Sequence, residues 1–117
     1  MRSILVQGEL SSDQLASTFQ GVVGEVQTVI TYAFGSVRVV LLVGRKFFFR
    51  SNDYLGLALL ATTDGTTQRI DLSTAGGGSG VFGVQWGAGA SFEEELYQAI
   101  SSALAQSSLS AQEVTAS

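Results

Sequence analysis

The sequence contains no cysteine and no histidine among its 117 residues. Disulfides, thiolate nucleophiles and zinc sites built from cysteine and histidine are therefore excluded. The Ser-His-Asp and Cys-His arrangements of hydrolases and the commonest general base are excluded as well. Asp53, Asp64 and Asp71 are accounted for by turns or by a cross-strand partner such as Arg69. We therefore expect no enzyme, no metal site and no cofactor.

Proline is also absent, so every strand amide is available for pairing and long antiparallel ladders form easily. Charged residues are scarce at 14%, against about a quarter in typical domains. Hydrophobic residues make up 45% of the chain. A sparsely charged surface indicates either burial by a partner or by self-association, or solvation by the many Ser, Thr, Gln and Gly residues.

The net charge is −4, although five of the six cations lie between residues 38 and 69. Nucleic-acid binding normally requires a basic face, so we do not expect a nucleic-acid partner. No apolar run approaches the roughly 20 residues that span a bilayer. The apolar segment at residues 4–6 is too short for a signal peptide. We expect a soluble, cytoplasmic protein with no membrane partner.

The first 24 residues predict a short strand and then a helix. Residues 3–9 are apolar at their centre and suit a strand. Ser11 and Gln14 have the spacing of a capping box, in which each side chain binds the other's backbone amide. Leu15, Phe19 and Val22 recur at helical spacing after this start.

Residues 25–74 have the pattern of a sheet. We predict strands at 26–34, 37–49, 54–62 and 67–74, since these stretches are rich in β-branched and aromatic residues. Gly35-Ser36 and Asp64-Gly65 mark hairpin turns, the second of a primed type with positive φ angles. Gly44 is expected to bend or bulge the long second strand. The last strand alternates strictly, which predicts one solvated face.

The second helix is predicted at residues 92–105, with Ser91 as its N-cap and Glu94 completing a capping box. Residues 106–117 are rich in Ser, Ala and Gln and weakly hydrophobic, so we expect a frayed, flexible tail. The domain is accordingly assigned to residues 1–105.

The predicted order is β-α-β-β-β-β-α, an α+β fold with two layers. Strands joined by short turns pair antiparallel, so the sheet has five or six antiparallel strands with two helices on one face. Residues 37–43 and 55–60, however, carry apolar side chains toward both faces. A strand that is apolar on both faces is covered on both. The second face must close as a barrel or dock on another copy, and we expect a homodimer through this face.

Seven of the 14 glycines lie between Gly76 and Gly89. Residues 78–83 match G-x-G-x-x-G, but the helix that a dinucleotide site requires begins too late. Glu93, Glu94 and Glu95 would repel a phosphate at the helix start, and consecutive acids on a helix diverge too widely for a hard cation. The remaining hypothesis is a small-molecule contact through six residues: Gly78, Ser79, Gly80, Phe82, Trp86 and Ser91.

Residues 45–50 combine three cations with three consecutive phenylalanines. Such a strip is a stacking platform in proteins that bind single-stranded nucleic acid. The plainer interpretation is a strand end with aromatic side chains in the core and cations at the rim. The acidic net charge favours the plainer interpretation.

Taken together, these motifs resemble the bacterial family named Domain of Unknown Function 6054 over about residues 4–104. The similarity rests on the first strand and helix, the aromatic and basic strand at 45–50 with the apolar hairpin after it, Gly77-Gly78-Ser79, and the acidic segment at 92–96. The details of Lys46-Phe47-Phe48 and the length of the glycine-rich segment depart from the family pattern. The resemblance implies a small cytoplasmic bacterial domain and supplies no activity.

We therefore expect a non-enzymatic interaction module that self-associates. The alternative is a small-molecule pocket between the sheet and the last helix, gated by the glycine-rich segment with Trp86.

Overall fold

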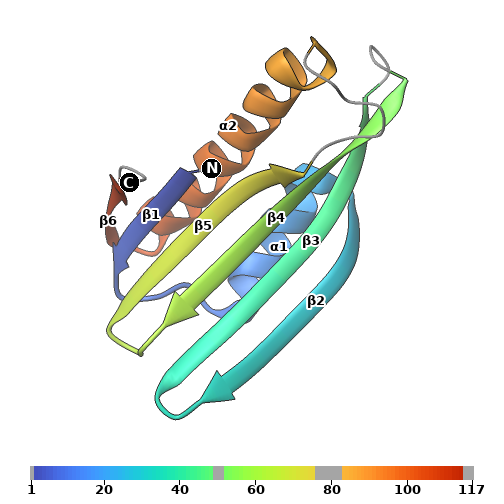
Figure 1. Ribbon diagram of the computed structural model, residues 1–117. Helices are drawn as coiled ribbons and strands as arrows, with labels where there is room; N and C mark the ends of the chain where they lie inside the picture. The colour runs from blue at the N-terminus through green and yellow to red at the C-terminus, as the bar shows by residue number, and fades with distance from the viewer. Residues whose placement is uncertain (1, 49–51, 76–82, 115–117) are drawn as a thin grey trace.

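The computed structural model describes residues 2–48, 52–75 and 83–114. One six-stranded sheet carries both helices on the same face (Figure 1). The elements are β1 (Arg2–Gln7), α1 (Ser12–Val23), β2 (Glu25–Phe34), β3 (Val37–Phe48), β4 (Asp53–Thr63), β5 (Thr67–Ala75), α2 (Gly83–Gln106) and β6 (Ser110–Val114). The predicted α+β class and the order β-α-β-β-β-β-α are confirmed, with a sixth strand added after α2.

The strands lie in the order β2-β3-β4-β5-β1-β6, and every neighbouring pair is antiparallel. β2 to β5 follow one another in the sequence and lie side by side in the sheet, as in a meander. β1 then pairs with β5, and β6 pairs with the other side of β1. Within the described chain, β2 and β6 are therefore the two edges of the sheet.

The core lies between the sheet and the helices. Helix α2 contributes apolar side chains four residues apart, and α1 contributes a similar stripe. The strands contribute the alternate positions that face the helices. The buried apolar residues are Leu15, Phe19, Val22 and Val23 of α1, Phe92, Leu96, Ile100 and Leu104 of α2, and Ile4, Val6, Val40, Leu42, Leu55, Leu57, Leu59, Ala61, Ile70 and Leu72 of the strands, with Leu10 between β1 and α1.

The predicted start of the first helix is confirmed. Ser11 Oγ accepts a hydrogen bond from the Gln14 amide at 3.1 Å, and Gln14 Oε1 accepts one from the Ser11 amide at 2.9 Å. This capping box satisfies two amide groups that would otherwise lack partners at the beginning of α1. The helix ends at Gly24, whose φ of +80° suits glycine.

The predicted start of the second helix is wrong. α2 begins at Gly83, so Ser91 lies within the helix and is not its N-cap. The acidic residues that follow Ser91 are consequently not in the first turn. The error has a local cause, because the added turns contain three glycines, each costing about 1 kcal/mol against alanine in a helix.

No helix in the described part of the chain is long and apolar enough to cross a membrane.

The expected frayed tail is also corrected, since Ser110–Val114 forms β6. After α2 the chain reverses at Ser108, which has a φ of +57°, and the Leu109 amide donates to the Leu104 carbonyl at 2.9 Å. Leu109 packs against the core. The folded domain therefore extends to Val114.

A β-bulge interrupts the pairing of β2 with β3 between Val26 and Thr28. The bulge predicted in β3 at Gly44 is thus found in β2, the strand that pairs with this part of β3. Gly44 itself faces α1, where an added Cβ would lie 2.7 Å from the Glu25 carbonyl oxygen. A side chain at this position would collide with the junction between α1 and β2.

Candidate functional site

The face of the sheet opposite the helices, here called the open face, carries no covering layer in the described structure. Strand β3 illustrates the division between the faces. Val40 and Leu42 are buried toward the helices, whereas Val39 and Leu41 are half-buried on the open face. The open face is therefore the surface on which the two-sided apolar strands expose their second set of side chains.

Half of the open face is polar. On β5 and β1, Ser3 Oγ donates to Asp71 Oδ1 at 2.5 Å, and Arg69 Nε donates to the same oxygen at 3.0 Å. Gln68, Ile70 and Leu72 of β5 are buried on the other side. The predicted solvated face of β5 is confirmed, and on this half nothing requires a partner.

The other half of the open face is apolar. We call this region the apolar patch, and it consists of Ile30, Tyr32, Phe34, Val37, Val39, Leu41, Val43, Ala58 and Leu60 of β2, β3 and β4. Its residues form rows across the strands, as where Ile30 lies opposite Leu41 and Leu41 opposite Leu60. No charged side chain interrupts these rows.

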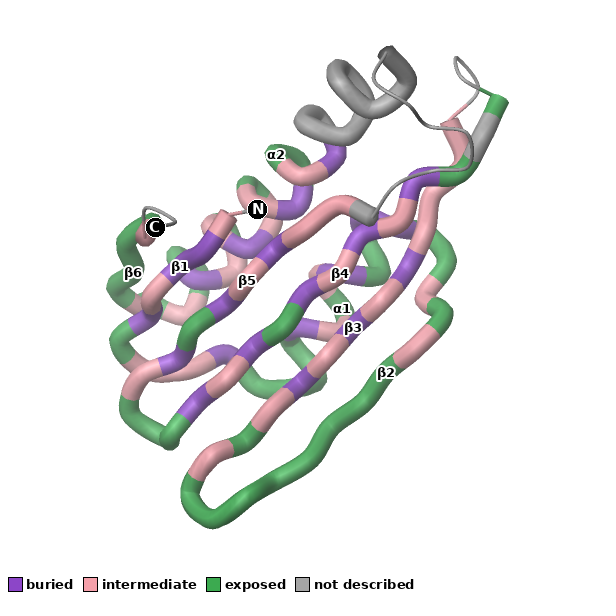
Figure 2. Tube along the Cα trace, viewed as in Figure 1, coloured by how far each residue is buried: buried purple, intermediate pink, exposed green. Residues whose placement is uncertain are grey.

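Exposure within the apolar patch is greatest on β2. Phe34 is 72% exposed, Tyr32 59% and Ile30 45%. Val29, which points to the helix side, is 58% exposed, because the helices leave this end of β2 uncovered. Figure 2 shows β2 as exposed along nearly all of its length. The β2 strand is thus exposed on both of its faces as well as along its outer edge.

The apolar patch ends at the charged end of the β2–β3 pair. Arg45 Nε donates to Glu25 Oε2 at 3.0 Å, and the Arg45 guanidinium lies 4.0 Å from the centre of the Tyr54 ring. Lys46 pairs with Glu95 at 3.7 Å. These contacts favour the strand-end interpretation for residues 45–48, whereas Phe49 and Arg50 lie outside the described residues.

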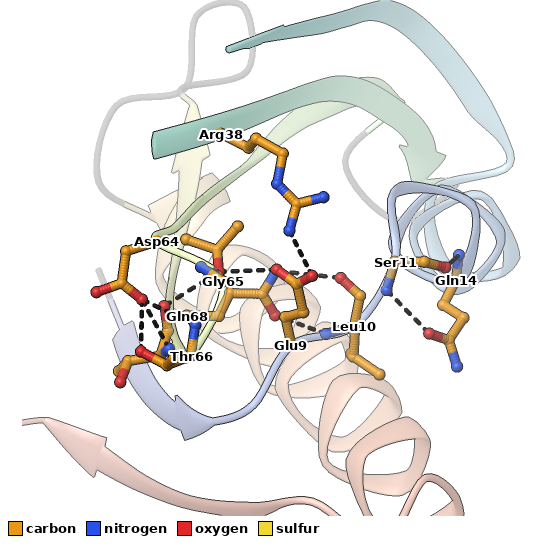
Figure 3. A network of polar contacts seen from close by, with 11 residues as sticks. Glu9, Leu10, Ser11, Gln14, Arg38, Asp64, Gly65, Thr66 and Gln68 are labelled. Carbon is orange, nitrogen blue, oxygen red and sulfur yellow. Dashed lines mark hydrogen bonds and ion pairs between the residues drawn. The ribbon is translucent and has the colours of Figure 1, made fainter. Parts of the chain in front are cut away.

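A polar network lies where the chain passes from β1 to α1 (Figure 3). Gln68 is 2% exposed, and its side-chain amide accepts from the Leu10 N–H at 2.9 Å and donates to the Leu10 carbonyl at 3.1 Å. Glu9 accepts hydrogen bonds from Thr63 Oγ1 at 2.8 Å and from Arg38. These bonds, Thr63 first, lower the pKa of Glu9 below its ordinary value.

A hollow of about 280 Å³ lies beside this network, lined by the first turn of α1 and by Arg38, Val40, Ala61 and Gln68. The Gln68 amide and the Glu9 carboxylate are both occupied by protein partners. The network therefore acts as a clamp that holds the β1–α1 connection, and it offers a ligand no unpaired buried group.

The β4–β5 turn lies beside the network. Asp64 Oδ1 accepts hydrogen bonds at 2.9 Å from the Thr66 and Thr67 amides and from Thr66 Oγ1. These bonds to the ionised carboxylate lower the pKa of Asp64 to about 2. The turn occurs where predicted, but of Asp64 and Gly65 only Gly65, at +98°, has a positive φ.

This turn predicts a pH dependence of stability. The pKa of Asp64 rises on unfolding from about 2 toward 3.8, so its contribution is complete above pH 3.8 and is lost as the pH falls through 2. The D64N variant keeps an oxygen acceptor without the charge. We expect D64N to be less stable than the wild type at pH 5, with the difference shrinking between pH 4 and pH 2, as measured by urea unfolding. A difference that stayed constant across this window would contradict the assignment.

Arg2 connects β1, β6 and α2 near the edge of the sheet that is remote from β2. Its guanidinium binds Glu113 of β6 through two nitrogens, at 3.1 and 2.9 Å, and also binds Glu94 of α2. It lies 3.7 Å from the centre of the Tyr97 ring. The bond from Arg2 is the main cause that lowers the pKa of Glu113, whereas the bond from Gln98 is the main cause for Glu94. No local pattern of residues predicts this cluster, because the strand order of the sheet brings its members together.

The sequence model of one family matches residues 14–113 of the chain. The chain belongs to the Family of unknown function (DUF6054). Membership confirms the resemblance drawn from the sequence. No curated protein and no solved structure was found to match the chain.

The proposed ligand residues of this DUF6054 chain are not assembled into a site by the described structure. Gly78, Ser79, Gly80 and Phe82 lie outside the described residues. Trp86 and Ser91 lie in the N-terminal part of α2, where only the backbone is described. Their role in binding stays a prediction.

A hollow of about 210 Å³ does lie between the sheet and α2 of this DUF6054 domain, lined by β1, β6 and the C-terminal half of the helix, including Tyr97, Ser101 and Leu104. Its volume is below the roughly 300 Å³ at which small-molecule pockets usually begin. It adjoins the half of α2 remote from the glycine-rich segment. The described structure therefore gives the gated-pocket alternative little support.

Proposed function

We propose that this protein is a non-enzymatic interaction module that self-associates through the β2 side of its sheet. We also propose that it is a bacterial, cytoplasmic protein. The absence of cysteine is compatible with that location, and the resemblance to the family implies it. The observation that carries the proposal is the exposure of four large apolar side chains on one strand: Val29, Ile30, Tyr32 and Phe34. These side chains leave β2 apolar on both of its faces, and exposed apolar patches of a few hundred Å² are often interaction sites.

The dimensions of the apolar patch limit what it can do alone. Three strands about 4.8 Å apart and about seven residues long at 3.4 Å per residue cover roughly 350 Å². A standard stable interface buries about 800 Å² on each partner. Contact through the apolar patch by itself would therefore be weak, and a stable assembly needs further surface next to β2.

The proposal predicts a dimer in solution. We expect light scattering at tens of micromolar to give twice the mass of the chain. The Y32K variant places a charge among the exposed apolar side chains of β2, and we expect it to weaken association by about tenfold or more.

The matched control is T67K, which adds the same lysine on the polar half of the open face and should leave the mass unchanged. A wild-type protein that remains monomeric at these concentrations, or equal behaviour of the two variants, would rule the proposal out.

A further inference from the structure

We propose that the partner is a second copy of this chain whose β2 strand pairs antiparallel with β2 across a two-fold axis at Thr31. The inference rests on the proposed self-association and specifies its geometry. Two six-stranded sheets would join edge to edge into one continuous sheet.

The two edges of the described sheet differ in their protection. β6 has five residues and includes Glu113, whose charge is held by Arg2. β2 has ten residues, and beyond Glu25 at its start it contains no charge and no proline. Natural edge strands are usually kept from pairing by short length, charge, proline or bulges. The single bulge in β2 ends at Thr28, so residues 28–34 form a regular, unprotected edge.

The hairpin turn determines which backbone groups face outward. Gly35 has a φ of +62° and Ser36 does not have a positive φ, as in a type II′ turn closed by Phe34 and Val37. The closing pair of a two-residue turn is hydrogen-bonded, and hydrogen-bonded pairs alternate along an antiparallel ladder. Tyr32 and Ile30 therefore bond to β3, and three residues present free N–H and C=O groups to the outside: Val29, Thr31 and Ala33.

These three residues are symmetric about Thr31, which is also the midpoint of residues 28–34. An axis at Thr31 places it opposite the partner's Thr31 and places Val29 opposite the partner's Ala33. The three resulting pairs would form about six hydrogen bonds. On the open face, Ile30 would lie beside the partner's Tyr32, an aromatic and β-branched pair of the kind that stabilises sheets. No charges oppose each other in this register.

The helix layer leaves room for a second sheet. Val29, Thr31 and Ala33 point to the helix side and are all exposed, so neither helix covers the edge at the proposed axis. The edge therefore complements itself in hydrogen bonding, in apolar character and in its lack of charge. These properties favour a second copy over a peptide from another protein, which would have to match the same register.

A single cysteine tests the axis directly, because the chain has no cysteine of its own. In the T31C variant the two sulfur atoms would belong to directly opposed residues, with Cα atoms about 5.5 Å apart, which is within disulfide range. We expect mild oxidation to yield a covalent dimer. The matched control is T28C on the same strand, where the two cysteines would lie about 20 Å apart along the ladder and should not link.

Charges introduced at position 31 provide an independent test. In T31K or T31E alone, like charges would face each other at the axis, and we expect each variant to be monomeric. An equimolar mixture should recover a heterodimer, since the opposed charges then attract. Circular dichroism of each variant checks that the exposed substitution leaves the fold intact.

The outcomes separate this geometry from self-association in general. Suppose that the wild type is a dimer, that T31K does not affect it and that T31C does not link it, whereas L60K on β4 dissociates it. This result would show that the open faces stack on each other. It would overturn the edge pairing and keep the proposed function. A wild type that is monomeric overturns both and leaves the β2 edge to an extended segment of another protein.

Discussion

Replacing Gln68 with leucine should lower the free energy of unfolding by about 2–6 kcal/mol. The side-chain amide of Gln68 is the hydrogen-bonding partner of both the N–H and the C=O of Leu10, and both residues are 2% exposed. Leucine fits the volume but bonds neither group, and each buried polar group left without a partner costs about 1–3 kcal/mol. Urea unfolding followed by circular dichroism measures the difference.

The matched control for Q68L is Q112L, the same substitution at an exposed position of β6. Surface changes of this kind usually stay within about 0.5 kcal/mol. If Q68L unfolded at the same urea concentration as Q112L, the Leu10 backbone would have found other partners, and the polar clamp would not hold the β1–α1 connection.

A second large effect is expected at Gly44. In G44A the new Cβ would lie 2.7 Å from the Glu25 carbonyl oxygen and 2.8 Å from Val23 Cγ2. The carbonyl belongs to the backbone at the start of β2 and cannot rotate away, so the junction of α1 with the sheet must shift. Overpacking of this kind costs about 1–3 kcal/mol, which we expect as a lowered thermal midpoint in calorimetry.

The G21A variant makes the same glycine-to-alanine change, but we expect it to raise the stability of the protein. Gly21 lies within α1, and an added Cβ there meets nothing within 4 Å. Alanine is favoured over glycine in a helix by about 1 kcal/mol, so G21A should be more stable than the wild type. Equal effects of G44A and G21A would contradict the close approach at Gly44.

Local patterns were sufficient to predict much of the fold. The Ser11–Gln14 capping box, the hairpin turns and the alternation of β5 depend on residues close in sequence, and all are present. β6 could not be predicted, because its polar sequence becomes a strand only by pairing with β1. The early turns of α2 were missed for the converse reason, since their glycines disfavour a helix in isolation.

The candidate site was predicted only in part. Apolar residues on both faces of β3 and β4 predicted that the second face of the sheet is apolar, which the apolar patch matches; whether another copy covers it stays a prediction. Its concentration on β2 could not be foreseen, because which strand lies at the edge depends on the strand order of the whole sheet. The alternation of Ile30, Tyr32 and Phe34 in an otherwise uncharged stretch was the available signal.

The pairing of Ser3 with Val114 brings the first and last described strands side by side. β1 lies four strand positions from β2, roughly 20 Å away, and β6 lies one position further. A domain fused at either end, or a tether to a solid support, would thus attach at the margin remote from β2. Such attachments would leave β2 accessible. In a dimer paired through β2, the domains fused to the two copies would lie at opposite ends of the continuous sheet.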